Sequence, residues 1–242
     1  MGKAKDLIVK IISPKIATDF IKNNHYSGKV AATGQVYFGG FFDNKLMCVA
    51  QWGRPINKYL HINIVKNTKW NEFLELNRLV CLDGTPKNTE SRFIKVMLIL
   101  IKKNAPQIKW VISFADATQC GDGTIYRASG FSLISIKSSE QIYQLPNGDK
   151  MHLMGLQGGE YGAMRKKMLN MGYTNAKKFM VEVLKGKQIK GYQLKYIYLI
   201  DKNCELNIPT MSFDKIDEMG VGMYKGEKIT LAQRKVNMDQ SV

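Results

Sequence analysis

The order of strand-like and helix-like segments constrains the fold of this chain most. Runs of β-branched or alternating apolar residues, typical of strands, recur between segments with the period of an amphipathic helix. The predicted order is strand, helix, two-stranded hairpin, strand, helix, strand, short helix, strand, a basic insertion and a final strand. Because strands and helices interleave around a hairpin, we expect an α/β fold with one mixed central sheet flanked by helices.

Local signals place individual elements within this order. The first strand ends at Ser13-Pro14, the residue types preferred at a helix N-cap and in the first helical turn, so a helix is expected to about Asn23. Asp43-Asn44 lies between two apolar runs and predicts the tight turn of an antiparallel hairpin. A long helix is expected over 91–104, because apolar residues recur on one helical face: Phe93, Val96, Met97, Leu100 and Ile101.

The size and charge of the chain limit the kinds of partner that it can have. Its 242 residues are 45% hydrophobic, which is enough for one core with an appended lobe. The formal net charge is +16 and the pI is near 9.6. A charge this large indicates a polyanionic partner, of which nucleic acid is the commonest, and the alternative is a soluble enzyme that is merely basic.

A basic, partly helical segment divides the chain. We expect a catalytic core at 1–138, an insertion lobe at 139–190, and a final core strand with a C-terminal tail at 191–242. From Lys137 to Lys195 there are eleven Lys or Arg residues and four Asp or Glu residues, with tyrosines interleaved. Basic side chains bind phosphates and aromatic rings stack on bases, although a solvated helix face is the plainer alternative. The residues expected at nucleic acid are Arg165, Lys166, Lys167, Lys177, Lys178, Lys187 and Lys190.

Cysteine usage and the chain start indicate a reducing compartment. The four cysteines are scattered and form no C-x-x-C pair, which argues against a zinc knuckle or a disulfide framework. No apolar run reaches about 18 residues, so no transmembrane helix is expected. The first residues lack the apolar core of a signal peptide. We therefore expect an intracellular protein without a membrane partner.

The stretch SFADATQCGDGTIYRASGF, residues 113–131, departs from the pattern of a buried strand. Ser113 and Asp116 stand at the end of an apolar strand, and a Gly-rich break separates them from a short helix carrying Tyr126. A carboxylate at the carboxyl end of a strand points into the crevice where open α/β sheets bind ligands, and a tyrosine there can donate a proton. The structural alternatives are an Asx-turn for Asp116, a backbone hydrogen bond for Ser113 and a core position for Tyr126.

Arg78 interrupts an apolar strand. Strict alternation over 74–82 predicts two faces. The face with Arg78 would also carry Leu74, Leu76, Val80 and Leu82, and the other would carry Glu75, Asn77, Leu79 and Cys81. A buried guanidinium needs an anionic or hydrogen-bonding partner. Glu75 or Asp116 would be a structural partner, and a phosphate or a flipped base would be a functional one.

The element order resembles the GNAT acyltransferase fold. In that fold a hairpin leads to a central strand, a phosphate-binding turn and a long helix, followed by a strand and a short helix bearing Tyr-x-x-x-Gly-Phe. Here that element is YRASGF, residues 126–131. The resemblance implies a GNAT-like sheet, an acetyl-CoA or related acyl-CoA donor, and a Tyr126 that protonates the departing group.

Five local matches resemble the Mom family of phage DNA-modification proteins, which are themselves GNAT-like. They cover about 20–135 and read HYSG, FGGFFDNKLMCVAQWG, ELNRLV, PKNTESRFI, and SFAD with GTIYRASGF. The resemblance implies transfer of a carbamoylmethyl group to adenine N6 in double-stranded DNA, which protects phage DNA from restriction in the cytoplasm of an infected or lysogenic bacterial host. It implies catalytic roles for Tyr126, Asp116, His25, Tyr26, Ser113 and Arg78.

The expected cofactor contacts depart from the usual GNAT pattern. The GNAT turn Gln/Arg-x-x-Gly-x-Gly/Ala cradles a pyrophosphate on backbone N–H groups. Here the turn keeps one of those glycines, and the expected contacts are Gly84, Lys87, Asn88, Thr89 and Ser91. Iron is associated with Mom proteins, but no dense spacing of His and carboxylates demands it, and a His-only site would need all three histidines: His25, His61 and His152.

Two other functions fit the same sequence. One is a CoA-dependent N-acetyltransferase for a protein or small amine, which the positive charge disfavours because a cationic substrate prefers an acidic cleft. The other is a non-catalytic DNA-binding protein that shields DNA from nucleases. A new base mass in DNA distinguishes both from the modification enzyme.

Overall fold

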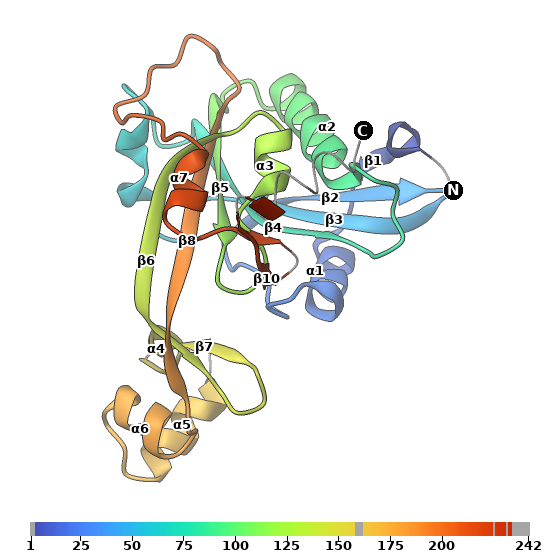
Figure 1. The fold of residues 1–242 in the computed structure, drawn as a ribbon. Helices are drawn as coiled ribbons and strands as arrows, with labels where there is room; N and C mark the ends of the chain where they lie inside the picture. Colours follow the sequence, from blue (N-terminus) through green and yellow to red (C-terminus); the bar gives the residue numbers. More distant parts are fainter. Residues whose placement is uncertain (1–2, 158–161, 225, 231, 234–242) are drawn as a thin grey trace.

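One eight-stranded sheet runs through the protein in the order β1-β2-β3-β4-β5-β8-β6-β7 (Figure 1). The computed structural model describes residues 3–157, 162–224, 226–230 and 232–233. The strands of the sheet are β1 (Ile8–Ile11), β2 (Gly34–Phe42), β3 (Lys45–Gly53), β4 (Phe73–Cys81), β5 (Trp110–Asp116), β6 (Ser132–Gln144), β7 (Lys150–His152) and β8 (Lys187–Leu199). β4 and β5 are parallel and the other neighbouring pairs are antiparallel, so the mixed sheet expected from the sequence is confirmed.

Helices cover both faces of this sheet (Figure 1). On one face, α1 (Pro14–Asn24) buries Ala17 and Ile21 against β3 and β4. On the other face, α2 (Thr89–Asn104) and α3 (Thr124–Ala128) pack on the main core, to which α2 contributes Phe93 and Met97. Three short 3-10 turns complete the core region: η1 (Ala4–Asp6), η2 (Lys58–Leu60) and η3 (Ile62–Ile64).

The local signals in the sequence mark real boundaries. The hydroxyl of Ser13 accepts the backbone N–H of Ile16 at 3.4 Å and caps α1. Asp43 and Asn44 adopt φ values of 47° and 61°, the left-handed conformation that a two-residue hairpin turn requires. Gly130, at φ 85°, ends the short helix α3.

The two faces predicted for β4 are wrong because the strand contains a β-bulge. Gln51 of β3 pairs with Arg78, but the next residue, Trp52, pairs with Leu76, so Asn77 is the extra residue. A bulge shifts the side-chain alternation by one position. Leu79 therefore faces the main core with Leu76, whereas Val80 faces α1.

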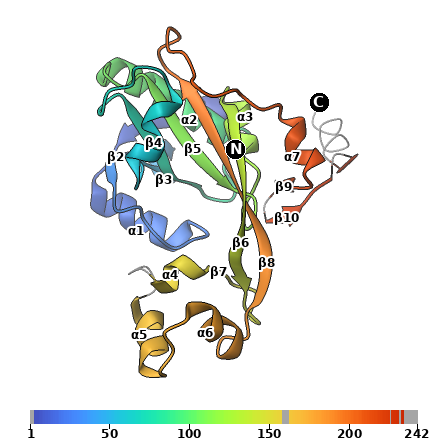
Figure 2. The same cartoon turned by 90° about the vertical axis from the view of Figure 1, so that its left-hand side faces the viewer.

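Strands β6 and β8 continue beyond the core sheet as a two-stranded ribbon that carries a lobe (Figures 1 and 2). The lobe contains β7, α4 (Leu153–Gln157), α5 (Gly162–Asn170) and α6 (Ala176–Glu182). It has an apolar cluster of its own, built on Tyr143, Met151, Leu156, Met168, Ala176, Phe179 and Met180. The ends of the expected insertion lie on the ribbon, where Ser139 pairs with Gly191.

The C-terminal segment packs back on the core. It contains α7 (Asp214–Glu218) and the small pair β9 (Met223–Tyr224) and β10 (Glu227–Lys228). Ile216, Val221 and Met223 join the main core. No helix in the described part of the chain combines the length and apolar composition that crossing a membrane requires.

Candidate functional site

The two parallel strands of the sheet separate after a short paired stretch. β4 and β5 pair from Phe73–Trp110 to Leu76–Ser113, and no further pair joins them. We call the region between 77–81 of β4 and 114–116 of β5 the strand split. The side chains that the sequence singles out converge on its walls, so the split is the candidate active site.

Asn77, the bulged residue, lines the split with an unusual polar group. Its side chain is buried and hydrogen-bonds the carboxyl group of Glu75. Its Oδ1 is buried with no hydrogen-bond partner among the described residues. Burial raises the pKa of Glu75, which the bond from Asn77 and the charge of Arg78 partly offset. The Oδ1 of Asn77 lies against the backbone of β3, because a Cβ on Gly53 would be 2.9 Å from it.

Arg78 is bound by backbone carbonyls rather than by a carboxylate. Its Nε donates to the carbonyl of Lys29 at 2.8 Å, and its Nη1 donates to the carbonyl of Asn77 at 2.6 Å. Within the described residues it forms no ion pair with Glu75 or Asp116. The guanidinium therefore keeps its positive charge available to an anion or a base edge.

The loop after α1 is held against the sheet from two sides. Buried Gln51 of β3 accepts the N–H of Ala31 at 2.9 Å and donates to the carbonyl of Ala31 at 2.7 Å. Arg78 holds Lys29 as described above. These bonds explain why a loop without regular period presents His25 and Tyr26 at a fixed place beside the split.

His25 is a neutral hydrogen-bond donor. Its Nδ1 accepts the backbone N–H of Ser27 at 3.1 Å and lies 2.8 Å from the Ser27 hydroxyl. Since a backbone N–H can only donate, the proton of the neutral ring resides on Nε2. Burial and the nearby Arg78 charge lower the pKa of His25 to about 4. The ring can therefore donate from Nε2 but does not carry a charge at neutral pH.

Tyr26 and Asp116 face each other across the split. Tyr26 is 53% exposed, and its ring lies 4.3 Å from that of His25. Burial of its hydroxyl and the Asp116 charge raise the pKa of Tyr26 above its ordinary value, so it stays protonated. Asp116 Oδ1 accepts the N–H of Thr118 at 2.9 Å and Oδ2 accepts from Gln119 at 3.2 Å. The Asx-turn foreseen as its structural role is present, and each oxygen retains acceptor capacity.

Tyr126 and Ser113 form the floor of the split. Tyr126 is buried, with Phe131 and Tyr196 rings at 5.6 and 5.3 Å, so the core position foreseen as its alternative is also present. Burial raises the pKa of Tyr126 to about 12, although its hydrogen bond with Ser113 opposes the rise. Ser113 Oγ lies 3.1 Å from the carbonyl of Leu76, to which it donates. The single Ser113 proton thus has two acceptors, the carbonyl and the phenol oxygen.

The Gly-rich break turns the chain around a buried carboxylate. Asp122 Oδ1 accepts from Arg127 Nη2 at 2.9 Å, and its Oδ2 accepts the N–H of Met223 at 3.1 Å. Gly123 adopts φ 85°, and a Cβ there would lie 2.4 Å from the ring of Tyr196. Only glycine fits this turn, which returns Tyr126 to the split.

Three side chains at the site were not among the residues selected from the sequence. Glu75 and Asn77 could have been found as polar residues inside an apolar strand. Cys120 lies in the turn after Asp116, where its N–H donates to the Asp116 carbonyl at 3.0 Å. Its thiol pKa is raised by burial and by the Asp116 charge.

Beyond Asp116, the same face of β5 carries an aromatic and cationic cluster. Lys195 Nζ lies 3.3 Å from His61 Nδ1 and 5.6 Å from the Phe114 ring, and His61 lies 5.7 Å from that ring. Burial and the charges of Lys195 and Lys137 lower the pKa of His61 to about 4. Burial and the charge of Lys137 lower the pKa of Lys195.

The turn before α2 offers backbone groups for one phosphate. Gly84 adopts φ 85° with open space around it, and Asn88 adopts φ 67° at the N-cap. The Arg92 N–H donates to the Asn88 carbonyl, so the Glu90 and Ser91 amides precede the helical ladder. The Ser91 hydroxyl, however, donates to the Asn88 carbonyl, and Thr89 is fully buried. A cavity of about 300 Å³ borders this turn, lined by Phe42, Asp43, Lys45, Met47, Gly84, Thr85 and Pro86.

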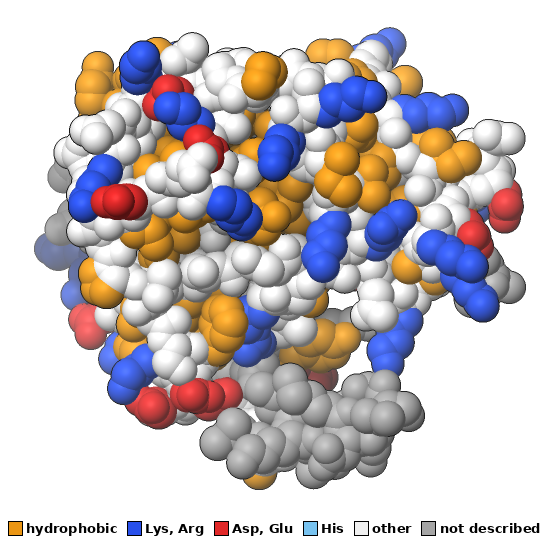
Figure 3. Space-filling model, turned by 90° about the horizontal axis from the view of Figure 1, so that it is seen from above, with side chains coloured by type: hydrophobic (Ala, Val, Ile, Leu, Met, Phe, Trp, Pro, Cys, Tyr) orange, Lys and Arg blue, Asp and Glu red, His pale blue; other side chains and the backbone are white. Residues whose placement is uncertain are grey.

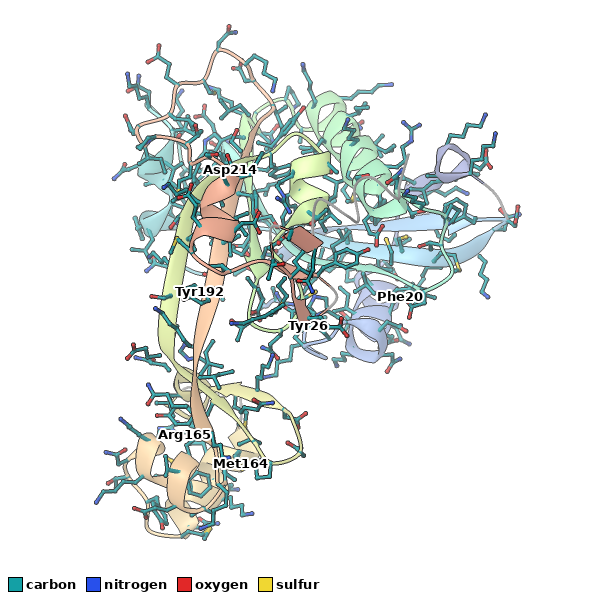
Figure 4. The ribbon with its side chains drawn as sticks, viewed as in Figure 1. Phe20, Tyr26, Met164, Arg165, Tyr192 and Asp214 are labelled. Carbon is teal, nitrogen blue, oxygen red and sulfur yellow. The ribbon has the colours of Figure 1, made fainter. Side chains whose placement is uncertain are left out.

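The seven basic residues expected at nucleic acid are all exposed. They lie on α5, on α6 and on the ribbon end of β8, and Figure 4 shows Arg165 in the lobe, well away from Tyr26. Lys and Arg side chains are also spread over the face seen in Figure 3. The positive charge therefore extends over both the lobe and the core.

The two depressed histidine pKa values predict a stability change in mild acid. His25 and His61 bind protons only near pH 4 when folded, but near pH 6.5 when unfolded. The unfolded state therefore binds more protons between these values, and the free energy of unfolding falls as the pH drops through this window. Thermal melting at pH 7.5, 5.5 and 4.5 measures it. His61→Gln should flatten the slope below pH 6.5 without changing it above pH 7, and an unchanged slope would contradict the assignment.

Comparison with known proteins identifies relatives. The model of the Mom protein family matches residues 6–215. The methylcarbamoylase mom of Escherichia phage Mu is 30% identical over 211 residues, which cover 87% of this chain and 82% of that protein.

Several solved acetyltransferases are similar to this chain at low identity. The ribosomal-protein-S18-alanine N-acetyltransferase of Escherichia coli is 8% identical with a TM-score of 0.44, covering 81% of this chain and 97% of that chain. The spermidine/spermine N-acetyltransferase SpeG of Vibrio cholerae is 10% identical with a TM-score of 0.41, covering 82% and 95%. A GNAT acetyltransferase of Brucella melitensis, solved with acetyl-CoA, is 13% identical with a TM-score of 0.36, covering 52% and 82%.

Proposed function

This chain belongs to the Mom protein family, and from that membership we propose that it is an enzyme that modifies DNA. The proposed reaction transfers a carbamoylmethyl-like or acyl-derived group to N6 of adenine in double-stranded DNA, protecting the DNA from restriction. The observation that carries the proposal is the strand split, where Tyr126, Asp116, Arg78, His25 and Tyr26 converge in a chain of net charge +16. Family membership supplies the substrate, and the site supplies the proton-handling groups.

Group transfer to N6 requires two proton movements. The adenine amine is a weak nucleophile because its lone pair is delocalised into the ring. As the bond from N6 to the incoming carbon forms, the bond from that carbon to the leaving group breaks. N6 gives up one proton, and the leaving group gains one. A site for this reaction needs an acceptor and a donor on opposite sides of the reacting carbon.

Tyr126 has the properties of the donor. With a pKa raised to about 12 it is protonated at neutral pH, so it can give a proton to a leaving group but cannot act as a base. When that proton leaves, Ser113 can turn its hydroxyl from the Leu76 carbonyl to the phenolate oxygen. This hydrogen bond would stabilise the phenolate at the moment the charge develops.

Asp116 has the properties of the acceptor. Each of its oxygens receives one hydrogen bond from the turn, which fixes the carboxylate and leaves lone pairs for the N6 proton. The protonated hydroxyl of Tyr26 beside it can bind the same adenine edge. His25 Nε2–H and the Arg78 guanidinium are further donors, suited to the ring nitrogens of adenine, which accept hydrogen bonds.

The residues present do not make a case for iron. No group of three or more His, Cys, Asp or Glu side chains within the described residues could hold a metal ion. The phosphate turn fits a single phosphate on its backbone amides, but Asp83 and Glu90 flank it and only one of the pattern's glycines remains. The proposed proton movements therefore rest on the side chains of Tyr126 and Asp116.

The lobe supports the duplex as the substrate. Its exposed lysines and Arg165 can bind phosphates on one side of a target adenine while the core binds the other. An adenine in duplex DNA must leave the base stack before its amine reaches the Asp116 carboxylate. Binding on both sides holds the duplex in place during that step.

Nucleoside mass spectrometry tests the proposal. Plasmid DNA is isolated from bacteria that express the protein, digested to nucleosides and compared with DNA from cells with empty vector. A new adenosine-derived mass supports the proposal, and its difference from adenosine identifies the added group. If the folded, abundant protein leaves only ordinary nucleosides, the proposal is wrong. CoA binding would then favour an N-acetyltransferase, and DNA binding without CoA would favour a nuclease shield.

A further inference from the structure

An exposed apolar loop ends at His61, whose ring contacts Phe114 on the face of β5 that also carries Asp116. It follows β3 at 54–61 and presents three large apolar side chains to solvent: Ile56 at 88% exposure, Tyr59 at 75% and Leu60 at 70%. It is the cyan segment at the left of Figure 1 and lies on the side facing the viewer in Figure 2. Single exposed apolar residues are ordinary, but three within five positions mark an interaction site.

The loop is held rigidly at its base. Lys58 is buried, with its Nζ 3.9 Å from the centre of the Trp70 ring and 5.2 Å from the centre of the Phe73 ring. The Tyr59 ring lies 5.5 Å from that of Trp70. The His61 N–H closes the turn on the Lys58 carbonyl at 3.0 Å. The apolar side chains therefore project from a fixed turn rather than from a loose segment.

The charge around the loop indicates an anionic partner. Residues 54–71 contain no Asp or Glu. Of their four cations, Arg54 and Lys69 are exposed, Lys66 is paired with Glu205 at 2.7 Å, and Lys58 is buried against Trp70. Across the same face, Lys137 and Lys195 add two further positive charges beside His61. The basic residues of such a loop can bind DNA phosphates, and its exposed apolar side chains can contact the base stack between them.

The loop is within reach of the candidate active site. His61, the residue after Leu60, contacts Phe114 through their rings at 5.7 Å. Phe114 and Asp116 lie on the same face of β5, two residues apart, which is about 7 Å along a strand. A duplex whose adenine enters the split would bring the neighbouring stack to the loop.

We propose that Ile56, Tyr59 and Leu60 form a wedge that enters the base stack and occupies the space left by the flipped adenine. The proposal rests on the proposed function, because it assigns these residues to the base-flipping step of that reaction. Apolar side chains inserted between base steps are a known means of unstacking DNA. Arg54, Lys69 and Lys137, which are exposed, would bind the phosphates on either side of the opened step.

Permanganate footprinting tests the wedge independently of the chemistry. Permanganate oxidises thymines that are unstacked, and a flipped adenine leaves its partner thymine unstacked. Purified protein is incubated with a duplex fragment of several kilobases, so the target sequence need not be known. The wild type should create hyper-reactive thymines. The triple variant Ile56→Ser/Tyr59→Ser/Leu60→Ser should reduce that reactivity at least about tenfold.

A matched variant controls for the loss of exposed apolar surface. Ile99, on α2, is 63% exposed on the opposite face of the sheet, so Ile99→Ser should behave as the wild type. The melting temperature of each variant confirms folding. The triple variant should still bind the fragment at low salt within about threefold, because phosphate contacts dominate duplex affinity.

Three outcomes would overturn the wedge. The first is that the triple variant leaves thymine reactivity unchanged, and the second is that the wild type creates no hyper-reactive thymine. The third is that the triple variant still opens DNA but no longer binds phosphatidylglycerol–phosphatidylcholine vesicles. The nucleoside composition of plasmid DNA shows whether the wedge alone or the proposed function itself is wrong. If the wild type and the triple variant modify adenine equally, only the wedge is wrong. If the wild type modifies nothing, the proposed function is wrong.

Discussion

Replacing Tyr126 by Phe is expected to reduce adenine modification at least about 100-fold, because it removes the proposed general acid and leaves the ring in place. The Phe ring preserves the contacts with Phe131 and Tyr196, so the fold should persist. Loss of the hydrogen bond with Ser113 should lower the free energy of unfolding by only about 1 kcal/mol. The ratio of modified to ordinary adenosine in plasmid DNA measures the effect, at equal levels of folded protein.

Tyr198→Phe is the matched control for this variant. Tyr198 packs on Phe131 at 5.3 Å and lies near Lys202, but it takes no part in the strand split. Its loss of a hydroxyl should leave modification unchanged. Modification at the wild-type level in Tyr126→Phe would show that Tyr126 is a core residue only. A variant that unfolds would be replaced by Ser113→Ala, which weakens the same hydroxyl without touching the ring.

The largest expected effect on stability comes from Asp122→Ala. Asp122 is fully buried and ion-paired with Arg127, and it also accepts hydrogen bonds from Thr124 and from the backbone of Met223. Removing one partner of a buried ion pair typically costs about 3–5 kcal/mol, because the other charge stays buried without compensation. Urea denaturation followed by far-UV circular dichroism measures the loss of unfolding free energy.

Asp214→Ala is the control for Asp122→Ala, because it removes a carboxylate that is not buried. Asp214 is exposed and accepts a hydrogen bond from Ser212 at 2.9 Å. Its replacement should change the free energy of unfolding by no more than about 0.5 kcal/mol. Equal effects of the two variants would mean that the Gly-rich turn does not depend on Asp122. Because α3 and the C-terminal pair both attach to this turn, Asp122→Ala should also reduce modification.

The sequence predicted the order of elements because periodicity, caps and turn residues act locally. Ser13, the Asp43-Asn44 turn and Gly130 stand where the structure ends or begins an element. It did not predict the bulge at Asn77, because the extra residue is defined only by the pairing of β4 with β3. The bulge also separates Arg78 from Leu74 and Leu76 and leaves it on the face of Val80.

The residues of the candidate site were also predictable only where the signal is local in the sequence. Ser113, Asp116 and Tyr126 could be selected from one short stretch, since polar residues at a strand end are unusual. That Arg78 bonds to the carbonyl of Lys29 could not be foreseen, because 49 residues separate the two in the chain. Lys195 enters the neighbourhood of the split through the pairing of β8 with β5, which no local pattern encodes.

The ribbon of β6 and β8 has a mechanical consequence. β8 runs without interruption from the lobe at Lys187 into the centre of the sheet, where Tyr196 pairs with Ser113 and its ring lies 5.3 Å from that of Tyr126. A two-stranded ribbon is stiff along its length and compliant in twist. A bent duplex that pushes on the lobe would therefore twist β8, and the twist would reach Tyr196 and the ring of Tyr126, the proposed acid.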